Sequence, residues 1–293
     1  MKPIVVSLLF VMSALSACTS STTEWAENTP GNLPDQYRIC VLGDAGTGKA
    51  EQYQVKDALL HEGCDELRMV GDVIYENGIT SADDPQLYDK FLTPYADLLS
   101  DRPFYIAMGN HDHKADDTAW IDVAQTHENV IFPSQYYATR RGDLCFITLD
   151  TEASYLAQVR WVHNLEPAMS DCALRIAFGH HPYFSSGHHG DANPGMKLFL
   201  RTTVMGDTDL YIAGHDHQLS DEGQLENTRL LISGAAGKLR NLKEVPRVWG
   251  VSQLGYLVLI VHRDPDLLEY QFKTVEEDGL ASIAFHDTMD FQR

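Results

Sequence analysis

Five short segments of this sequence carry side chains that could bind metal ions, and each follows a short apolar run. In chain order they are Gly43-Asp44, Gly71-Asp72-Val73-Ile74-Tyr75, Gly109-Asn110-His111-Asp112-His113, Gly179-His180-His181-Pro182 and Gly214-His215-Asp216-His217. Carboxylate, amide, imidazole and phenolate groups are all metal ligands in proteins. A side chain at the end of a strand projects from the rim of its sheet. The pattern therefore predicts a metal centre at the carboxyl edge of a sheet.

Asp72 and Tyr75 indicate that the metal centre could hold two cations, one of them strongly acidic. A carboxylate has two oxygens and can hold two cations, so Asp72 is the candidate for a bridging ligand. The phenol of Tyr75 could bind one of these cations if the cation is acidic enough to remove a proton whose unperturbed pKa is about 10. Gly-Asp is also an ordinary turn dipeptide and tyrosine is commonly a packing residue, so this segment alone does not establish a site.

The distribution of histidine strengthens the prediction. Of the 13 histidines, eight lie in these segments or between Gly187 and Gly190, namely His111, His113, His180, His181, His188, His189, His215 and His217. A single histidine is usually a structural residue, but a set of them beside strand ends indicates a metal centre. Asn110 offers a neutral oxygen ligand, and the histidine after it can face a substrate.

The stretches around these segments predict alternating strands and helices. Strands are expected at 38–42, 67–70, 104–108, 144–149, 174–178 and 210–213, and helices at 50–62, 85–99 and 153–169. The loop after the first strand nearly matches a phosphate-binding P-loop at Gly43, Gly48 and Lys49. Ala50 stands where that motif needs a hydroxyl group for magnesium, so we do not expect a nucleotide site there.

Composition limits the class of protein. At 293 residues and 44% hydrophobic, the chain can bury one sizeable core. It has 22 basic and 42 acidic residues, and the resulting net charge of -20 would repel nucleic acid and anionic lipid surfaces. We therefore expect no nucleic-acid partner.

The N-terminal region has the features of an export signal. Lys2 is followed by an apolar run at 4–15, which is too short to span a bilayer, and Leu15-Ser16-Ala17-Cys18 resembles the lipobox of bacterial lipoproteins. We expect a signal peptide at 1–17, lipidation of Cys18, a flexible tether at 18–36 and a catalytic domain at 37–293. This places the protein in the bacterial cell envelope, on the periplasmic or extracellular side, with the lipid anchor as its membrane contact. An unlipidated secreted protein is the alternative.

The other four cysteines would then enter an oxidising compartment. Cys40 and Cys64 lie beside one pair of expected strands, and Cys145 and Cys172 lie beside the next pair. If consecutive strands are neighbours, the expected disulfides are Cys40–Cys64 and Cys145–Cys172, although buried free thiols are nearly as consistent with the sequence.

Taken in order, the five segments resemble the motifs of the calcineurin-type metallophosphoesterase superfamily. Tyr75, the Gly-His-His-Pro segment and the Gly-His-Asp-His segment resemble in particular the small, tartrate-resistant purple acid phosphatases. The resemblance covers about 38–237, including Ser233-Gly234-Ala235-Ala236-Gly237. It implies an α/β fold, a four-layer αββα sandwich of two mixed β-sheets flanked by helices, with late strands near 256–262 and 268–274 completing the second sheet.

The resemblance also implies a binuclear centre. It places Asp44, Asp72, Tyr75 and His217 on a site that favours Fe(III), and Asp72, Asn110, His180 and His215 on a site that suits Fe(II), Zn(II) or Mn(II). His111 and His189 match the catalytic histidines that orient the phosphate and protonate the leaving group. The chain departs from the small purple phosphatases at Val73, where asparagine is usual, and in the turn at 45–48, which puts substrate preference in doubt.

The implied activity is that of an acid phosphatase acting on small phosphate monoesters, with a metal-activated hydroxide attacking phosphorus in line. One alternative keeps the site but assigns a phosphodiester or a nucleoside pyrophosphate as substrate. Another is a surface lipoprotein that binds metal without turnover. The complete set of ligands and proton donors argues against the latter.

Overall fold

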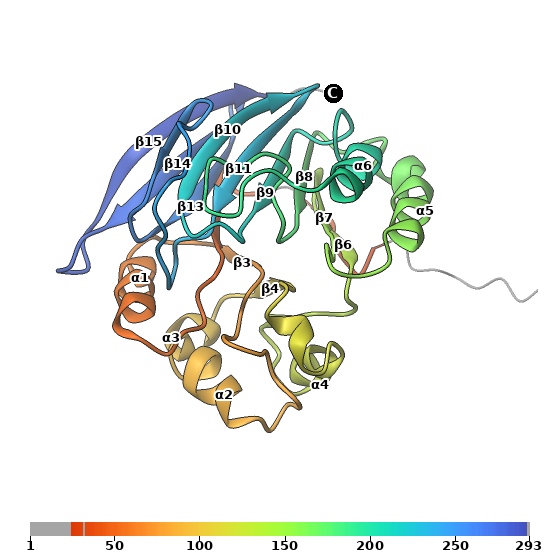
Figure 1. Cartoon of the computed structure of the whole chain (residues 1–293). Coiled ribbons are helices and arrows are strands. Elements are labelled where there is room, and N and C mark those ends of the chain that lie inside the picture. Colours follow the sequence, from red (N-terminus) through yellow and green to blue (C-terminus); the bar gives the residue numbers. More distant parts are fainter. Residues whose placement is uncertain (1–24, 32, 292–293) are drawn as a thin grey trace, which may run out of the picture.

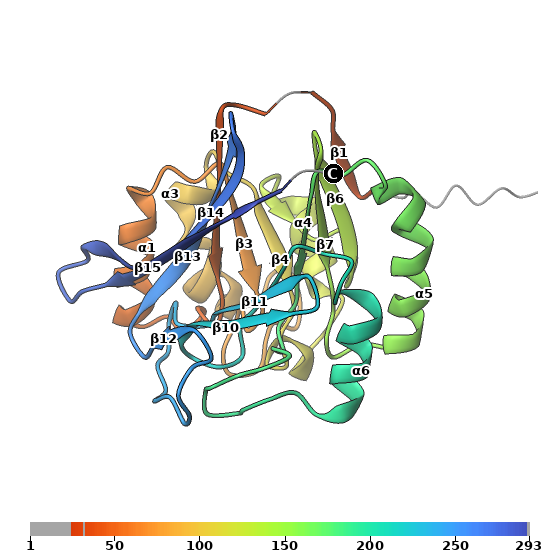
Figure 2. The ribbon, with the colours of Figure 1, turned by 90° about the horizontal axis from the view of Figure 1, so that it is seen from above.

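Two mixed β-sheets pack face to face and carry helices on both outer faces. Figures 1 and 2 show this arrangement in a computed structural model that describes residues 25–31 and 33–291. The predicted four-layer αββα sandwich is confirmed. Within the described residues, no helix has the length and apolar character needed to cross a bilayer.

The seven-stranded sheet has the order β15-β14-β13-β2-β3-β4-β5. Its strands are β2 (Gln36–Leu42), β3 (Glu66–Val70), β4 (Phe104–Ala107), β5 (Val130–Ile131), β13 (Gly255–Arg263), β14 (Asp266–Val275) and β15 (Ala281–Asp290). Strands β2 to β5 are parallel, whereas β13 pairs antiparallel with β2. The late strands therefore extend the sheet of the earliest strands, and their predicted place in the second sheet is wrong.

The eight-stranded sheet has the order β1-β6-β7-β8-β9-β11-β10-β12. Its strands are β1 (Glu27–Thr29), β6 (Tyr137–Arg141), β7 (Leu144–Thr148), β8 (Leu174–Phe178), β9 (Leu210–Ala213), β10 (Leu219–Leu225), β11 (Thr228–Ser233) and β12 (Trp249–Val251). Strands β7, β8 and β9 are parallel, so their carboxyl ends meet at one edge.

Except for η2 (Asp112–Lys114), which lies in the loop after β4, the helices cover the two outer faces. The others are α1 (Ala50–Leu60), α2 (Pro85–Leu87), η1 (Tyr88–Leu92), α3 (Ala96–Leu99), α4 (Ala119–Thr126), α5 (Tyr155–Leu165), η3 (Glu166–Met169) and α6 (Pro194–Thr203). Val55 of α1 and Trp120 of α4 pack on the seven-stranded sheet, and Phe199 of α6 packs on the eight-stranded sheet. Apolar side chains such as Val41 and Ile176 fill the space between the sheets.

The helix predicted at 85–99 is broken into three pieces. Asp84 caps its start by accepting a hydrogen bond from the Gln86 N–H. Pro94 interrupts it, because proline lacks an N–H and its ring clashes with the carbonyl four residues earlier. That carbonyl, on Lys90, accepts a hydrogen bond from Gln52 Nε2 at 2.6 Å instead. The break was readable in the sequence, so the prediction of one continuous helix is wrong.

The segment predicted as a tether is partly ordered. Strand β1, at Glu27–Thr29, pairs parallel with Thr139–Arg141 at the edge of the eight-stranded sheet. Residues 27–29 and Gln36 of the predicted tether therefore lie in strands. The predicted signal peptide and Cys18 lie outside the described residues.

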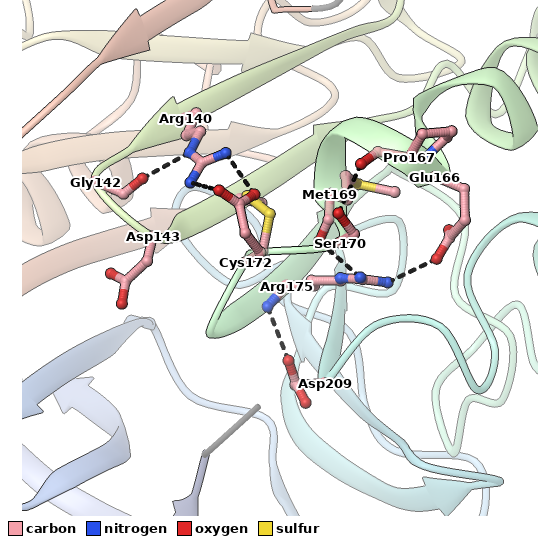
Figure 3. Close-up of a disulfide and its surroundings, with 12 residues drawn as sticks. Arg140, Gly142, Asp143, Glu166, Pro167, Met169, Ser170, Cys172, Arg175 and Asp209 are labelled. Carbon is pink, nitrogen blue, oxygen red and sulfur yellow. Dashed lines mark hydrogen bonds and ion pairs between the residues drawn. A yellow bond between two sulfur atoms is a disulfide. The ribbon is translucent and has the colours of Figure 1, made fainter.

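Both expected disulfides are confirmed. Cys40 bonds to Cys64, and Cys145 bonds to Cys172. Figure 3 shows the surroundings of the second bridge, where Arg140 and Arg175 flank Cys172. The Arg175 backbone N–H donates to Asp209 at 2.8 Å, and its guanidinium donates to Glu166 at 3.0 Å. These contacts fix the start of β8.

Candidate metal centre

All five predicted segments lie at the carboxyl ends of parallel strands. They follow β2, β3 and β4 in one sheet, and β8 and β9 in the other. Because the two sheets pack face to face, the loops from both meet at one edge of the sandwich. This arrangement brings together donors that are up to 173 positions apart in the sequence, from Asp44 to His217.

Asp44, Tyr75 and His217 form one group of donors. The Tyr75 hydroxyl donates to Asp44 Oδ1 at 2.8 Å and lies 3.1 Å from His217 Nε2. His217 Nε2 is 3.4 Å from the same carboxylate oxygen. Burial, together with the negative charges of Asp44 and Asp72, raises the pKa of the Tyr75 phenol. Only a strongly acidic cation would therefore displace its proton.

Asn110, His180 and His215 form a second group. His180 Nε2 lies 3.1 Å from Asn110 Oδ1 and 3.2 Å from His215 Nδ1. The other ring nitrogen of His180 is 2.9 Å from the Val70 carbonyl, to which it donates. This hydrogen bond fixes the tautomer and leaves the Nε2 lone pair facing the group. Burial lowers the pKa of His215, which keeps that imidazole neutral and able to bind a metal.

Asp72 lies between the two groups. Its Oδ1 is 3.5 Å from His180 Nε2, and its carboxylate adjoins the Tyr75 phenol. The ligand atoms of Asp44, Asp72 and His180 all lie within 4.8 Å of one another. Carboxylate, amide and imidazole lone pairs thus converge from both groups on a small volume. The chemistry of this donor set fits two cations that share Asp72.

The backbone of these loops takes an unusual conformation. Asp44, Asp72 and His215 have left-handed φ angles of 60°, 49° and 69°. Side chains rarely adopt this region, and such residues concentrate at functional sites. Gly71 before Asp72 has a φ of +89°, and a Cβ there would lie 2.3 Å from His180 Nδ1. The glycine is therefore required where the two groups approach each other.

The two predicted catalytic histidines, His111 and His189, lie beside the candidate donors. The His111 ring packs on the Tyr75 ring at 4.5 Å, and its backbone N–H donates to Asp72 at 2.8 Å. The His189 ring lies 4.3 Å from the His215 ring. Partial burial lowers the pKa of His189, against the opposing charge of Asp216. His188 is exposed and lines a hollow with Leu239, Arg240, Asn241 and Ser252, none of which is a candidate donor.

Two buried carboxylates that the sequence prediction did not single out hold these loops. Asp112 accepts hydrogen bonds from the backbone N–H groups of Val73, Ile74 and Gly109, and so ties the loop after β3 to the loop after β4. Burial and the charge of Asp72 raise the pKa of Asp112 to about 7. The two carboxylates belong to Asp112 and Asp216. Each lies inside one of the predicted motifs, and this was the signal by which the sequence could have indicated them.

Asp216 connects the histidine loops in the same way. Its Oδ1 accepts the His189 backbone N–H at 2.8 Å, and its Oδ2 accepts the Ser185 hydroxyl at 2.5 Å. The side chain is fully buried. It therefore positions the loop of His189 relative to the two histidines on either side of Asp216 in the chain.

A small cleft of about 120 Å³ opens above the donors. It is lined by Asp72, Glu76, Asn110, His111, His189, His215, His217, Lys238 and Arg240. The last two residues come from the loop after β11 and were also absent from the sequence prediction. Nothing in their local pattern distinguishes them from ordinary surface cations.

Comparison with known proteins agrees with this geometry. The family model of the calcineurin-like phosphoesterases matches residues 37–219. The chain is 28% identical to purple acid phosphatase 3 of Arabidopsis thaliana over 268 residues, covering 80% of this chain and 73% of the plant protein. It is 25% identical to tartrate-resistant acid phosphatase type 5 of Sus scrofa over 215 residues, covering 63% of each chain.

Solved structures show the same architecture. GAP50, the anchor in the inner membrane complex of Plasmodium, superposes with a TM-score of 0.71 at 17% identity, over 88% of this chain and 90% of that one. A dimetal phosphatase from Danio rerio superposes with a TM-score of 0.54 at 11% identity, over 87% of this chain and 99% of that one. At these identities the likeness concerns the fold alone. From the family match and the sequence relatives together, the chain belongs to the calcineurin-like phosphoesterase family and is a hydrolase of phosphoric esters.

Proposed function

We propose that this protein is an acid phosphatase that hydrolyses small phosphate monoesters at a binuclear metal centre. The observation that carries the proposal is the position of Asp72 between two complete groups of donors. The relatives named as purple and tartrate-resistant acid phosphatases support the same assignment.

In this proposal each group of donors holds one cation. Asp44, Tyr75 and His217 would hold Fe(III), because phenolate and carboxylate favour a trivalent ion. Asn110, His180 and His215 would hold Fe(II), Zn(II) or Mn(II), and Asp72 would serve both sites. When bound, the two cations acidify a water molecule and neutralise charge that develops on the phosphoryl group.

His111 and His189 would handle the substrate. His111 Nδ1 lies 2.6 Å from the Glu76 carbonyl, so Nε2 is the ring nitrogen that would face a phosphate oxygen, with Lys114 Nζ 3.4 Å from it. His189 would donate a proton to the oxygen of the departing alcohol. Because burial lowers its pKa, His189 carries that proton only in acid, and the step should weaken as the pH rises. The expected optimum is therefore acidic.

The direct test is turnover by the purified protein loaded with iron and zinc. Aryl phosphate monoesters should be hydrolysed faster than the matching diesters, and metal analysis should give two ions per chain. Faster hydrolysis of the diesters would assign the phosphodiesterase alternative. Metal binding without hydrolysis of any ester would assign a binding protein.

We also propose that the protein is a lipoprotein of the bacterial cell envelope, anchored through Cys18 and acting on small phosphate esters. The resemblance of 15–18 to a lipobox supports this. Mass spectrometry of the native N-terminus should find acylated Cys18, and an unmodified terminus at another residue would contradict the proposal.

A further inference from the structure

The loop after β11 brings two cationic side chains to the mouth of the metal centre. The Lys238 ammonium lies 3.0 Å from Glu76 and 3.3 Å from the centre of the Tyr75 ring. The Arg240 backbone is held at both ends, because its N–H donates to the His217 carbonyl and its carbonyl accepts from Ser252. Both side chains line the cleft above the donors.

Arg240 has no carboxylate partner, which is unusual in this chain. Among the described arginines, Arg240 and Arg160 alone lack an ion pair, although the sequence has 42 acidic residues and a net charge of -20. Arg160 lies on the exposed side of α5, whereas Arg240 lies beside His189 and lines the cleft. A guanidinium held at a binding cleft without a protein carboxylate is available to an anionic ligand.

A second hollow adjoins the cleft on this side. Its volume is about 390 Å³, and it shares His217, Lys238 and Arg240 with the cleft. Lys49 lines the hollow but not the cleft, and no ion pair engages it among the described residues. Three cations therefore face one hollow beside the metal centre, with Glu51 as the single carboxylate among its lining residues.

We propose that this hollow binds a second anionic group of the substrate, a phosphate or a carboxylate, while the scissile phosphoryl group lies in the cleft. This inference rests on the proposed phosphatase function and names its substrate class: esters that carry another anion. The planar Arg240 guanidinium can bind such a group through two parallel hydrogen bonds, and Lys49 and Lys238 add charge.

The test compares substrates that differ in one group. The three substrates share a three-carbon chain. Propane-1,3-diol monophosphate carries no second anion, its bisphosphate carries a second phosphate, and 3-phosphooxypropanoate carries a carboxylate. We expect Arg240→Gln to lower the ratio of kcat/KM for a doubly anionic substrate to that for the monophosphate by about 10-fold, mainly through KM. Lys49→Gln should lower the same ratio. Arg160→Gln, the other unpaired arginine, is the matched control and should leave it unchanged.

The outcomes separate the hypotheses. A larger fall for the bisphosphate assigns the hollow to phosphate, and a larger fall for 3-phosphooxypropanoate assigns it to a carboxylate. An equal loss of kcat/KM for all three substrates would mean that Arg240 binds the scissile group, and unchanged kcat/KM values for all three would mean that the hollow binds nothing. Either outcome overturns the inference.

A binding measurement keeps the inference testable without turnover. By calorimetry, propane-1,3-bisphosphonate should bind the wild-type protein more tightly than propylphosphonate, and Arg240→Gln should remove most of that preference. Equal affinities in the wild type would overturn the subsite. Absence of turnover with that preference intact would overturn the proposed phosphatase function and leave the subsite standing.

Discussion

The phenol of Tyr75 provides a test of whether the group of Asp44, Tyr75 and His217 binds a trivalent cation. Its hydroxyl contacts Asp44 and His217, and burial beside two carboxylates raises its pKa. If the phenolate binds Fe(III), the protein should be purple or pink from a charge-transfer band. Tyr75→Phe should remove this band and leave the circular dichroism spectrum unchanged, since the ring is retained. A colourless wild-type protein with full activity on two divalent ions would contradict the assignment.

His189 can be tested separately from the metal ligands. General acid catalysis is typically worth about 10²- to 10⁴-fold, so His189→Ala should lose activity on that order with alkyl phosphates and less with aryl phosphates, whose leaving groups need less proton assistance. His188→Ala is the matched control. The His188 ring is exposed and is not among the residues that line the cleft, so this substitution should leave the rates unchanged.

Metal analysis distinguishes this role from ligation. His189→Ala should keep two ions per chain, whereas His215→Ala should lose metal and activity together. Loss of metal in His189→Ala, or an equal loss for good and poor leaving groups, would rule out proton donation by His189.

At the scale of elements, an ion pair joins the turn after β4 to the loop after β7. His113 Nε2 lies 2.9 Å from both oxygens of the fully buried Asp150. Burial opposes the charge on His113, but Asp150 outweighs it and raises the pKa of His113 above 6.5. A pKa raised in the folded state stabilises the fold fully below the unfolded value, and this contribution is lost as the pH rises through the folded value.

We therefore expect His113→Gln to lower the free energy of unfolding by about 1.5–3 kcal/mol at about pH 5.5 and by less at about pH 8.5. Urea unfolding at the two pH values measures the difference. His163→Gln, at an exposed position on α5, is the control and should show little effect at either pH. An equal loss at both pH values would show that the charge of His113 does not contribute.

At the scale of the whole molecule, the two disulfides lie on opposite sides of the sandwich, each between a sheet and the helices that cover it. Cys40–Cys64 lies in the core under α1, and Cys145–Cys172 lies in the core under α5 and α6. They close loops with sequence separations of 24 and 27, for which chain entropy predicts about 3.5 kcal/mol each. Replacing each pair by alanine should lower the free energy of unfolding by about that amount, as measured with urea.

The two losses should add, because distant sites without shared partners are usually independent. The protein with all four alanines provides the check. A departure from the sum by more than ~1 kcal/mol would show that the two outer layers are coupled through the sheets.

The convergence of the candidate donor side chains at one edge could be predicted because each one lies within a few residues of the strand that positions it. An apolar run, a glycine and a ligand side chain are local information, and parallel strands then bring such corners to one edge. Pro94 was also local information, and it marks the break in the helix predicted at 85–99. Asp112 and Asp216 were visible as carboxylates inside the motifs, but their hydrogen bonds to neighbouring loops were not.

The local sequence pattern could not predict which distant strands pair with each other. Strand β13 pairs with β2, and its continuous apolar run from Tyr256 to Val261 suits either sheet equally well, so the pattern does not select a partner. Arg240 likewise reaches the cleft only because the loop after β11 folds back onto the His217 carbonyl. The meeting of the candidate donors was therefore predictable from spacing, whereas the position of the cations beside them depended on the tertiary structure.

The left-handed backbone at Asp44, Asp72 and His215 restricts how this centre could be redesigned. Each position requires a donor atom and a residue that tolerates a positive φ, and among side chains with ligand atoms, asparagine, aspartate and histidine meet both conditions best. A library that offers cysteine at these three positions should return mostly destabilised variants. Attempts to install a softer metal should instead vary Tyr75, His180 and His217, whose backbone does not have a positive φ.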